Sequence, residues 1–402
     1  MGEKEVVIVS AVRTPFGKFG GLLKDIPSID LGAMVIKEVL NRVDLPGNVL
    51  DQVFYGTCIP AETGIHTNIP ARQAMLKAGL PPETLSLTID RACCSSITAV
   101  QLAYQAIVSG VSQVVLAAGA ENMSRTPLLA TKARWGQRIG DLTLIDPLFE
   151  LGYKEFNPVA VDAGEVALEH DISREDQDLW AYNSQQRYAK AAAEGKFEDE
   201  LMPLAVPQRR GEPFRLETDE SPKPDTSLEK LSKLPTVYGS PTVTAGNAPA
   251  LSTGASAILL MTEEKAQELG FTPLAKVRSI ASIALKPRLL AESPAPAISK
   301  ALTNATWELD DIDLIEINEA FAAMPLVAST ILANGDKPKI EALREKINVN
   351  GGAVAMGHPV GASGARILMT LVYELRRRGG GKGVAAICGG LAQGDAVAVE
   401  VV

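Results

Sequence analysis

Short hydrophobic runs alternate along the chain with longer segments in which apolar residues recur at helical spacing. Continuous apolar runs at residues 6–10 and 114–118 predict strands that are buried on both faces of a sheet. Apolar positions three or four residues apart over 31–43 predict an amphipathic helix between them. Residues 313–317 and 384–387 predict two further strands near the C-terminus. The pattern therefore predicts an α/β protein.

The second half of the chain repeats the order of the first half. The strand at 313–317 resembles the one at 52–55, and the helix after Ser363 resembles the helix after Ser96. Two α/β halves of similar order predict a duplicated fold with a pseudo-two-fold axis. We expect two βαβαβ-type halves that form a layered α/β/α/β/α core. The N-terminal half is predicted to comprise residues 1–120 plus about 236–265, and the C-terminal half residues 266–402.

Residues 121–235 interrupt this alternation with helices and polar loops. Ser173 is predicted to cap a helix over 176–193, and residues 207–235 are rich in Pro, Lys, Asp and Glu. We interpret 121–235 as an inserted loop domain that lies over the core, because such insertions often cover or bind substrate.

Composition and charge narrow the classes of function. The chain has 402 residues and a formal net charge of −9, and no basic run contains interleaved aromatic residues, which argues against a nucleic-acid surface. The uncharged stretch near 320–335 is shorter than the roughly 20 apolar residues that cross a bilayer, so no membrane span is expected. Four cysteines without a CxxC pattern or a disulfide framework favour a reduced, cytoplasmic compartment.

Two residues with acyl-transfer chemistry occupy corresponding places in the two halves. Cys93 lies where an irregular segment enters an apolar helix, and unpaired N–H groups at a helix start stabilise a thiolate. His358 lies in a glycine-rich turn just before the corresponding helix of the second half. A pseudo-two-fold axis would bring the two turns face to face. A thiol activated by an imidazole is a standard nucleophilic pair.

Two more residues fit the same chemistry. Cys388 is flanked by glycines at the end of a predicted strand, and a thiol is a weak acid suited to moving a proton to and from carbon. Asn318 follows the strand at 313–317, and its amide could hold a water or an oxyanion.

Over nearly its whole length the chain resembles the thiolase family, which includes acetyl-CoA acetyltransferases and 3-ketoacyl-CoA thiolases. The most specific combination is Asn-Glu-Ala-Phe at 318–321, Gly-His-Pro-x-Gly-x-Ser-Gly at 357–364 and the glycine-flanked Cys388. The other matching segments, in order, are 12–17, 71–74, Cys93 with Ser95, 119–124 and 242–247.

The resemblance implies a thiolase-like fold and a thioester mechanism. Cys93 would attack the substrate and carry the acyl group, while His358 takes the thiol proton. Asn318 would orient a water near the first oxyanion. Cys388 would protonate the departing enolate and then deprotonate incoming coenzyme A. The N–H groups of Cys93 and Gly390 would form the second oxyanion hole. Coenzyme A is then a co-substrate, and no permanently bound cofactor or metal is expected.

The resemblance also implies contacts with coenzyme A, and here the sequence departs from the family. The expected coenzyme A contacts are Lys223, Ala245, Gly246, Asn247, Pro249 and Phe321. Lys223 replaces an expected arginine, Pro249 an expected serine, and Leu391 and Ala392 two glycines, while Pro158-Val159-Ala160 stands where many thiolases have a His-Met-Gly run. These changes predict a substrate bulkier or more branched than acetoacetyl-CoA.

Several alternatives remain open from the sequence. A decarboxylating ketoacyl synthase shares a duplicated fold and a nucleophilic cysteine but lacks the second glycine-flanked cysteine. A metal site built from Cys93, Cys94, His358 and Cys388 is a different class, although adjacent cysteines are poor tetrahedral ligands. A third interpretation is a weakly active subunit that needs a partner protein. By resemblance, the chain is expected to be a homodimer or homotetramer.

Overall fold

Two α/β halves with the same strand order make up the computed structural model, which describes residues 4–66, 68–150 and 155–402. The strands of the first half are β1 (Val6–Arg13), β3 (Gln52–Gly56), β4 (Leu85–Ile89), β5 (Val114–Asn122) and β8 (Ser252–Thr262), in the order β4-β3-β5-β8-β1. The strands of the second half are β9 (Ala275–Ala284), β10 (Leu314–Ile317), β11 (Gly381–Gly389) and β12 (Gln393–Val401), in the order β10-β11-β12-β9.

The two orders correspond strand by strand, which confirms the predicted duplication. β3 runs parallel to β5, as β10 does to β11, and the next strand toward the centre of the sheet from each pair, β8 or β12, is antiparallel. Ile347 makes a parallel bridge to Ile315, at the position that β4 occupies beside β3. A short antiparallel pairing of β1 with β9 joins the halves into one hydrogen-bonded sheet, which the two-residue strand β2 (Gly17–Lys18) extends beside β8.

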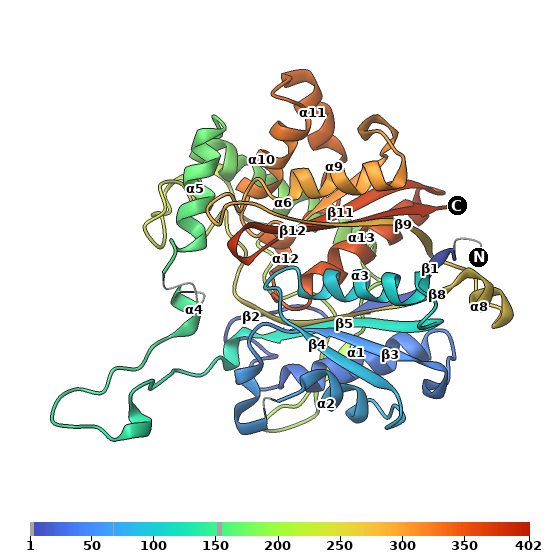
Figure 1. Cartoon of the computed structure of the whole chain (residues 1–402). Helices are drawn as coiled ribbons and strands as arrows, with labels where there is room; N and C mark the ends of the chain where they lie inside the picture. The colour runs from blue at the N-terminus through green and yellow to red at the C-terminus, as the bar shows by residue number, and fades with distance from the viewer. Residues whose placement is uncertain (1–3, 67, 151–154) are drawn as a thin grey trace.

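Helices cover both halves and fill the space between them (Figure 1). The central helices are α3 (Ser95–Val108) and α13 (Ser363–Arg377), which pack against each other between the two groups of strands. The outer helices are α1 (Ser28–Asn41) and α2 (Pro70–Lys77) on the first half, and α9 (Pro294–Ala305) and α10 (Ala323–Leu332) on the second. The predicted α/β/α/β/α arrangement is confirmed.

A glycine allows the two central helices to meet at their N-terminal ends. A Cβ atom on Gly364 would lie 2.5 Å from the backbone nitrogen of Ile97, closer than side chains approach backbone in folded proteins. The Ala365 N–H donates a hydrogen bond to the Ser96 hydroxyl at 3.0 Å, so the first turns of α3 and α13 are in direct contact. The turn before α3 and the turn before α13 therefore lie next to each other between the two halves.

The segment between β5 and β8 contains α6 (Arg174–Ala193), the longest helix that the structure describes. The elements of this segment are α4 (Pro147–Glu150), α5 (Val159–Glu169), α6, β6 (Leu204–Val206), β7 (Phe214–Leu216) and α7 (Leu228–Ser232). Ser173 caps α6 by accepting a hydrogen bond from the Asp176 N–H, as predicted. Two more helices, α8 (Glu263–Glu268) and α11 (Lys337–Lys346), lie on the periphery, and α12 (Ala353–Met356) precedes α13.

Only part of this segment lies over the core. Helices α5 and α6 pack against the apolar core of the second half. The stretch 126–146 instead projects away from the body as an arm, closed by one antiparallel bridge between Leu129 and Ile145 (Figure 1). The expectation that all of 121–235 lies over the core is therefore wrong for the arm. The domain division at 120, 236 and 265 stays a prediction.

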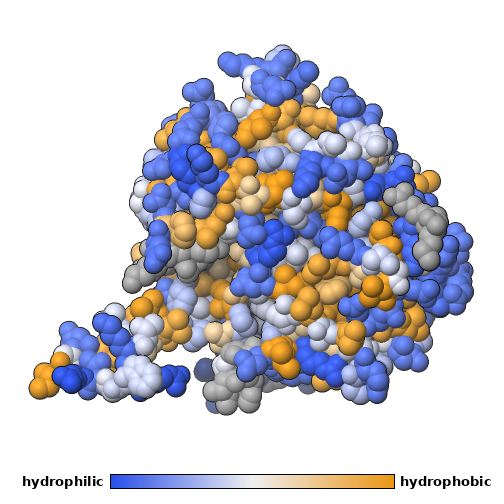
Figure 2. Space-filling view, viewed as in Figure 1, coloured by the Kyte–Doolittle hydropathy of each residue, from blue (hydrophilic) through white to orange (hydrophobic). Residues whose placement is uncertain are grey.

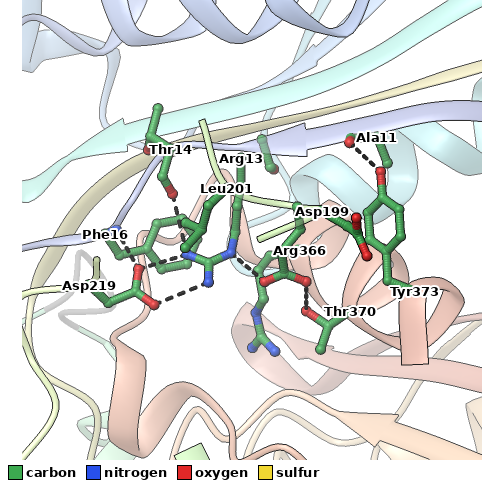
Figure 3. Close-up of polar contacts among 12 residues, drawn as sticks. Ala11, Arg13, Thr14, Phe16, Asp199, Leu201, Asp219, Arg366, Thr370 and Tyr373 are labelled. Atoms are coloured by element: carbon green, nitrogen blue, oxygen red, sulfur yellow. Dashed lines mark hydrogen bonds and ion pairs between the residues drawn. The ribbon is translucent and has the colours of Figure 1, made fainter. Parts of the chain in front are cut away.

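A buried ionic network joins the first strand to the inserted segment and to α13 (Figure 3). The Arg13 guanidinium donates to Glu200 at 2.6 Å and to Asp219 at 2.7 Å, and all three side chains are fully buried. Tyr188 from α6 donates to Asp219, and Thr370 from α13 donates to Glu200. One arginine therefore pairs with two carboxylates at the junction of three parts of the chain.

Replacing Arg13 by methionine is expected to lower the free energy of unfolding by about 3–5 kcal/mol, because it leaves two buried carboxylates without their cation. Chemical denaturation of the purified variant measures this loss. Arg278→Met is the matched control, because Arg278 pairs with Glu5 and Glu400 at a partly exposed site, where an ion pair contributes up to about 1 kcal/mol. Equal effects of the two substitutions would contradict the prediction.

Candidate active site

A tight turn presents Cys93 at the entrance of α3. Ala92 has a positive φ of 48°, which reverses the chain just before the cysteine. The Ser95 hydroxyl accepts a hydrogen bond from the Arg91 N–H at 2.9 Å and donates one to the Ala92 carbonyl at 2.7 Å. Cys93 is half-buried and remains accessible, so the turn fixes a thiol that a substrate can reach.

His358 lies directly against this thiol. Its Nε2 atom is 3.1 Å from the Cys93 sulfur, although the two residues are 265 positions apart. The His358 turn, between α12 and α13, is held by the first half of the chain. The His358 N–H donates to the Ser252 hydroxyl on β8 at 3.0 Å, and the Gly361 N–H donates to Glu121 on β5 at 3.0 Å. The predicted meeting of the two turns is confirmed.

The hydrogen bonds of Ser363 determine which nitrogen of His358 carries the proton. The Ser363 hydroxyl donates its one hydrogen to the Pro359 carbonyl at 3.0 Å. Its oxygen, 2.6 Å from His358 Nδ1, must then accept a hydrogen bond from that nitrogen. The imidazole is therefore protonated on Nδ1, and the lone pair of Nε2 faces the Cys93 thiol, as a general base requires.

The neighbouring cysteine faces a different part of the protein. Cys94 is fully buried, and its thiol donates to the Ile387 carbonyl at 3.6 Å. Only Cys93 of this pair has its sulfur within hydrogen-bonding distance of an imidazole in the residues that the structure describes. The geometry favours Cys93 over Cys94 as the nucleophile.

Asn318 completes the cluster from the end of β10. Its Nδ2 atom is 3.4 Å from His358 Nε2, and its Oδ1 accepts a hydrogen bond from Arg366 at 3.1 Å. Because a guanidinium only donates hydrogen bonds, it fixes the amide with its oxygen away from the site and its NH₂ group toward His358. Arg366 is itself paired with Glu316 at 3.4 Å, and both side chains are buried.

Sequence reasoning missed this Glu316–Arg366 pair behind the amide. The signal was a charged residue, Glu316, inside the otherwise apolar strand β10 and a second one, Arg366, in the buried first turn of α13. A buried charge needs a partner of opposite sign, so two such residues on neighbouring buried elements indicate a pair.

Cys388 and Gly390 lie beside the Cys93 turn. A Cβ atom on the intervening Gly389 would be 2.8 Å from the Cys94 sulfur and 3.1 Å from the Arg91 carbonyl oxygen, so the turn after β11 packs directly on residues 91–94. Cys388 is fully buried. Burial, and to a smaller extent the neighbouring Cys93, raises the pKa of the Cys388 thiol well above its usual value. The thiol is therefore protonated at neutral pH.

Burial also keeps the Cys93–His358 pair uncharged. It raises the pKa of Cys93 to about 12, while a hydrogen bond from its own N–H acts in the opposite direction. Burial, followed by the nearby Arg366 cation, lowers the pKa of His358 to about 3. At neutral pH the resting pair is therefore a thiol and a neutral imidazole rather than a thiolate and an imidazolium.

This protonation state predicts how alkylation of Cys93 by iodoacetamide depends on pH. The rate is expected to rise steadily from about pH 6 to pH 9, by up to tenfold per pH unit, because the thiolate fraction grows with pH below the pKa. Peptide mass spectrometry at timed intervals follows Cys93 separately from Cys58. A plateau that begins near pH 7 would contradict the prediction, because it would indicate a thiolate–imidazolium pair.

A cavity of about 250 Å³ lies between the inserted segment and the residues that precede β8. It is lined by Lys223, Ala245 and Gly246, which are three of the predicted coenzyme A contacts, and it extends to Val354 on α12, in the segment that leads to His358. The Lys223 N–H donates to the Gln185 side chain at 2.7 Å, which fixes one wall of the cavity.

The other three predicted contacts lie outside this lining. Asn247 is fully buried, and its amide donates to Asp178 at 2.9 Å, so its side chain stabilises the loop instead of facing the cavity. Pro249 falls between two lining residues, Ala248 and Ala250. Phe321 packs against the apolar core of the second half. A role for these three residues in binding coenzyme A stays a prediction.

Two findings concern metal binding and membrane insertion. No group of three or more His, Cys, Asp or Glu side chains within residues 4–66, 68–150 and 155–402 could hold a metal ion. In the same ranges, every helix is too short or too polar to cross a membrane.

Comparison with known proteins agrees with the geometry over the full length of the chain. Sequence models of the thiolase N-terminal domain and the thiolase C-terminal domain match residues 6–264 and 271–401. An acetyl-CoA acetyltransferase of Chromobacterium violaceum is 43% identical over 401 residues, which cover 98% of this chain and 99% of the relative. A probable acetyl-CoA acyltransferase of Staphylococcus aureus is 40% identical over 396 residues, or 95% of this chain and 98% of the relative.

Solved structures give the same result. The acetyl-CoA acetyltransferase of Bacillus anthracis superposes with a TM-score of 0.93 at 37% identity, covering 100% of this chain and 99% of that one. Human mitochondrial 3-ketoacyl-CoA thiolase in complex with CoA superposes with a TM-score of 0.90 at 38% identity, covering 99% and 98%. A decarboxylating ketoacyl synthase is therefore not favoured. With both domain models matched and relatives similar from end to end, the chain belongs to the thiolase family.

Proposed function

We propose that this thiolase cleaves a 3-oxoacyl-CoA with coenzyme A, or runs the reverse Claisen condensation, through a thioester on Cys93. Cleavage yields acetyl-CoA, or a related acyl-CoA, and a shortened acyl-CoA. The observation that carries the proposal is the 3.1 Å contact between the Cys93 sulfur and Nε2 of His358. The names of the relatives, acetyl-CoA acetyltransferases and a 3-ketoacyl-CoA thiolase, support the same activity.

In the first step, the Cys93 sulfur attacks the 3-oxo carbonyl carbon as its proton passes to His358 Nε2. The NH₂ group of Asn318 and the imidazolium then face the developing oxyanion, directly or through a water. The bond between the α- and β-carbons breaks, and its electron pair goes to the α-carbon of the leaving acyl-CoA. The Cys388 thiol protonates that carbon and becomes a thiolate.

In the second step, the Cys388 thiolate takes the proton of the incoming coenzyme A thiol. The sulfur of coenzyme A attacks the Cys93 thioester, and the new oxyanion accepts hydrogen bonds from the N–H groups of Cys93 and Gly390. The Cys93–acyl bond breaks, and His358 returns its proton to the Cys93 sulfur. Both thiols end as they began, so the cycle balances with coenzyme A as co-substrate and needs no permanently bound cofactor.

Intact-mass spectrometry of the protein mixed with a panel of 3-oxoacyl-CoAs tests this function. A stable mass gain that matches one acyl group is expected, and coenzyme A should remove it. Absence of any adduct on the folded protein would overturn the proposal and favour a weakly active subunit that requires a partner protein.

The same panel tests the substrate class. We propose a 3-oxoacyl-CoA bulkier than acetoacetyl-CoA, because Pro249 and Lys223 depart from the family pattern near the cavity. The largest kcat/KM is expected for a longer or branched acyl chain. The substrate proposal fails if acetoacetyl-CoA has the largest value.

We also propose that the chain assembles as a homodimer or homotetramer. The edge strand β4 exposes Leu85 and Leu87, at 64% and 50%, and an edge strand with apolar side chains is normally covered by another chain. The projecting arm exposes Trp135 at 88%, and residues coloured as hydrophobic are visible along it in the surface view (Figure 2). Two separate apolar surfaces suit a dimer of dimers.

Replacing both Leu85 and Leu87 by glutamate is expected to reduce the molar mass in solution by half or more, because like charges would then face each other across the edge. Size-exclusion chromatography with light scattering measures this change. Leu128→Glu on the arm is the comparison, and it should affect only the tetramer. A wild-type protein that runs as a monomer would contradict the proposed assembly.

We assign the protein to the cytoplasm, where thiols stay reduced. All four cysteines are free, and the proposed cycle needs both Cys93 and Cys388 as thiols. Cell fractionation with an antibody to the protein tests this location.

A further inference from the structure

The carbonyl oxygen of Ala92 accepts three hydrogen bonds, one more than its number of lone pairs. The donors are the Ser95 N–H at 3.0 Å, the Ser95 hydroxyl at 2.7 Å and the Cys58 thiol at 3.0 Å. Cys58 comes from the loop after β3, so a residue outside the Cys93 turn helps to hold it. The orientation of this one carbonyl group is therefore set from two parts of the chain.

The peptide that contains this carbonyl also contains the N–H of Cys93. In a planar trans peptide the C=O and N–H groups point in opposite directions. Holding the Ala92 oxygen toward Cys58 and Ser95 therefore directs the Cys93 N–H to the other side. That N–H faces the reactive sulfur: burial raises the pKa of the Cys93 thiol, and a hydrogen bond from this N–H opposes the rise.

Ala92 adopts its conformation at an energetic cost. A positive φ of 48° is unfavourable for a residue with a Cβ atom and persists only where the surroundings enforce it. The three hydrogen bonds to the Ala92 carbonyl, together with the one that the Ala92 N–H donates to Asp90 at 3.0 Å, supply that enforcement. Without the Cys58 donor, the Ala92 carbonyl keeps only the two hydrogen bonds from Ser95 among the residues that the structure describes, and Ser95 lies in the same turn.

Cys58 is itself anchored to the group that holds the His358 turn. The N–H groups of Cys58 and Ile59 donate to the buried carboxylate of Glu121, at 2.9 and 3.0 Å. The same carboxylate accepts the hydrogen bond from Gly361, three residues after His358. The thiol of Cys58 is thus placed relative to the catalytic pair by short, direct contacts.

We propose that Cys58 and Ser95 are positioning residues for the oxyanion hole of the acyl-enzyme step, because they aim the Cys93 N–H through the Ala92 carbonyl. This inference rests on the proposed function. The loss of one oxyanion donor costs about 10²–10³ in kcat. A donor that is present but misdirected should cost part of that, about 10-fold to 100-fold.

Cys58→Val and Cys58→Ser form the test pair. Valine removes the donor and keeps the bulk, whereas serine keeps a donor. The kcat for acyl transfer is expected to fall about 10-fold or more in Cys58→Val, with KM within about twofold, and Cys58→Ser should restore most of it. Ser95→Ala should lower kcat at least as much, with circular dichroism and thermal melting confirming that each variant is folded.

Alkylation of Cys93 by iodoacetamide distinguishes a misdirected Cys93 N–H from a general disturbance of the active site. Displacement of iodide develops no oxyanion, so the Cys93 N–H affects it only through the pKa of the Cys93 thiol. The alkylation rate of Cys58→Val is therefore expected to fall much less than kcat, by no more than about threefold. A parallel fall in alkylation and acyl transfer, or full acyl transfer in Cys58→Val, would overturn the inference. Absence of acyl transfer in the wild-type arm would overturn the proposed function, and this inference with it.

Discussion

Replacing Cys93 by alanine is expected to abolish the acyl-enzyme and to lower kcat/KM by about four orders of magnitude or more. The sulfur is the atom that forms the covalent intermediate, and the other members of a nucleophile–base unit contribute little without it. Intact-mass spectrometry with the 3-oxoacyl-CoA panel and steady-state thiolysis rates measure the two effects.

Cys94→Ala is the matched control for this substitution. The Cys94 thiol is buried against the Ile387 carbonyl, so its removal should leave the acyl-enzyme mass unchanged and kcat within about tenfold. An adduct that persists in Cys93→Ala but disappears when Cys94 is also replaced would move the nucleophile to Cys94. That result would contradict the role of Cys93 as the nucleophile, which is inferred from its distance to His358 and from the tautomer of the imidazole.

Replacing Cys388 by alanine is expected to lower the rates of carbon–carbon cleavage and condensation by about 10²–10⁴, the usual contribution of a general acid or base. Acylation of Cys93 by p-nitrophenyl acetate should be nearly unaffected, because the nitrophenolate leaving group departs without a proton. Release of nitrophenolate and thiolysis of a 3-oxoacyl-CoA are measured on the same preparation.

The ratio of these two rates distinguishes proton transfer from packing at Cys388. The turn that follows Cys388 packs on the Cys93 turn through Gly389, so a structural disturbance would slow both reactions together. An equal loss in both assays would contradict the assignment of Cys388 as the acid. Cys388→Ser keeps most of the volume with a weaker acid, and it should retain the ester reaction but not the cleavage.

The sequence was sufficient for the parts of the fold that repeat. Continuous apolar runs indicated buried strands because both faces of the sheets are covered by helices, and β5 and β11 were found in this way. The Cys93–His358 pair followed from the same repetition, because equivalent turns in two related halves meet at the axis between them. Neither residue considered alone would have predicted the pair.

The rest could not be predicted because it depends on which buried polar groups meet. Glu121 accepts hydrogen bonds from two turns far apart in the sequence, and Arg13 pairs with two acids from a segment of irregular pattern. A hydropathy pattern identifies such residues as polar but does not name their partners. The side-chain direction of Asn247 is a similar case. The sequence motif identified the residue, but it did not indicate that the side chain points inward and donates a hydrogen bond to Asp178.

The dependence of the His358 turn on β5 and β8 has a consequence for folding. The imidazole meets the thiol only after the second half has docked on the first, across 265 residues of chain, which makes this one of the longest-range contacts to form. Local helices form much faster than such contacts, and domains of this size fold through intermediates. During refolding, therefore, recovery of the catalytic rate reports the final docking of the halves. This recovery should lag behind recovery of the circular dichroism signal of the helices.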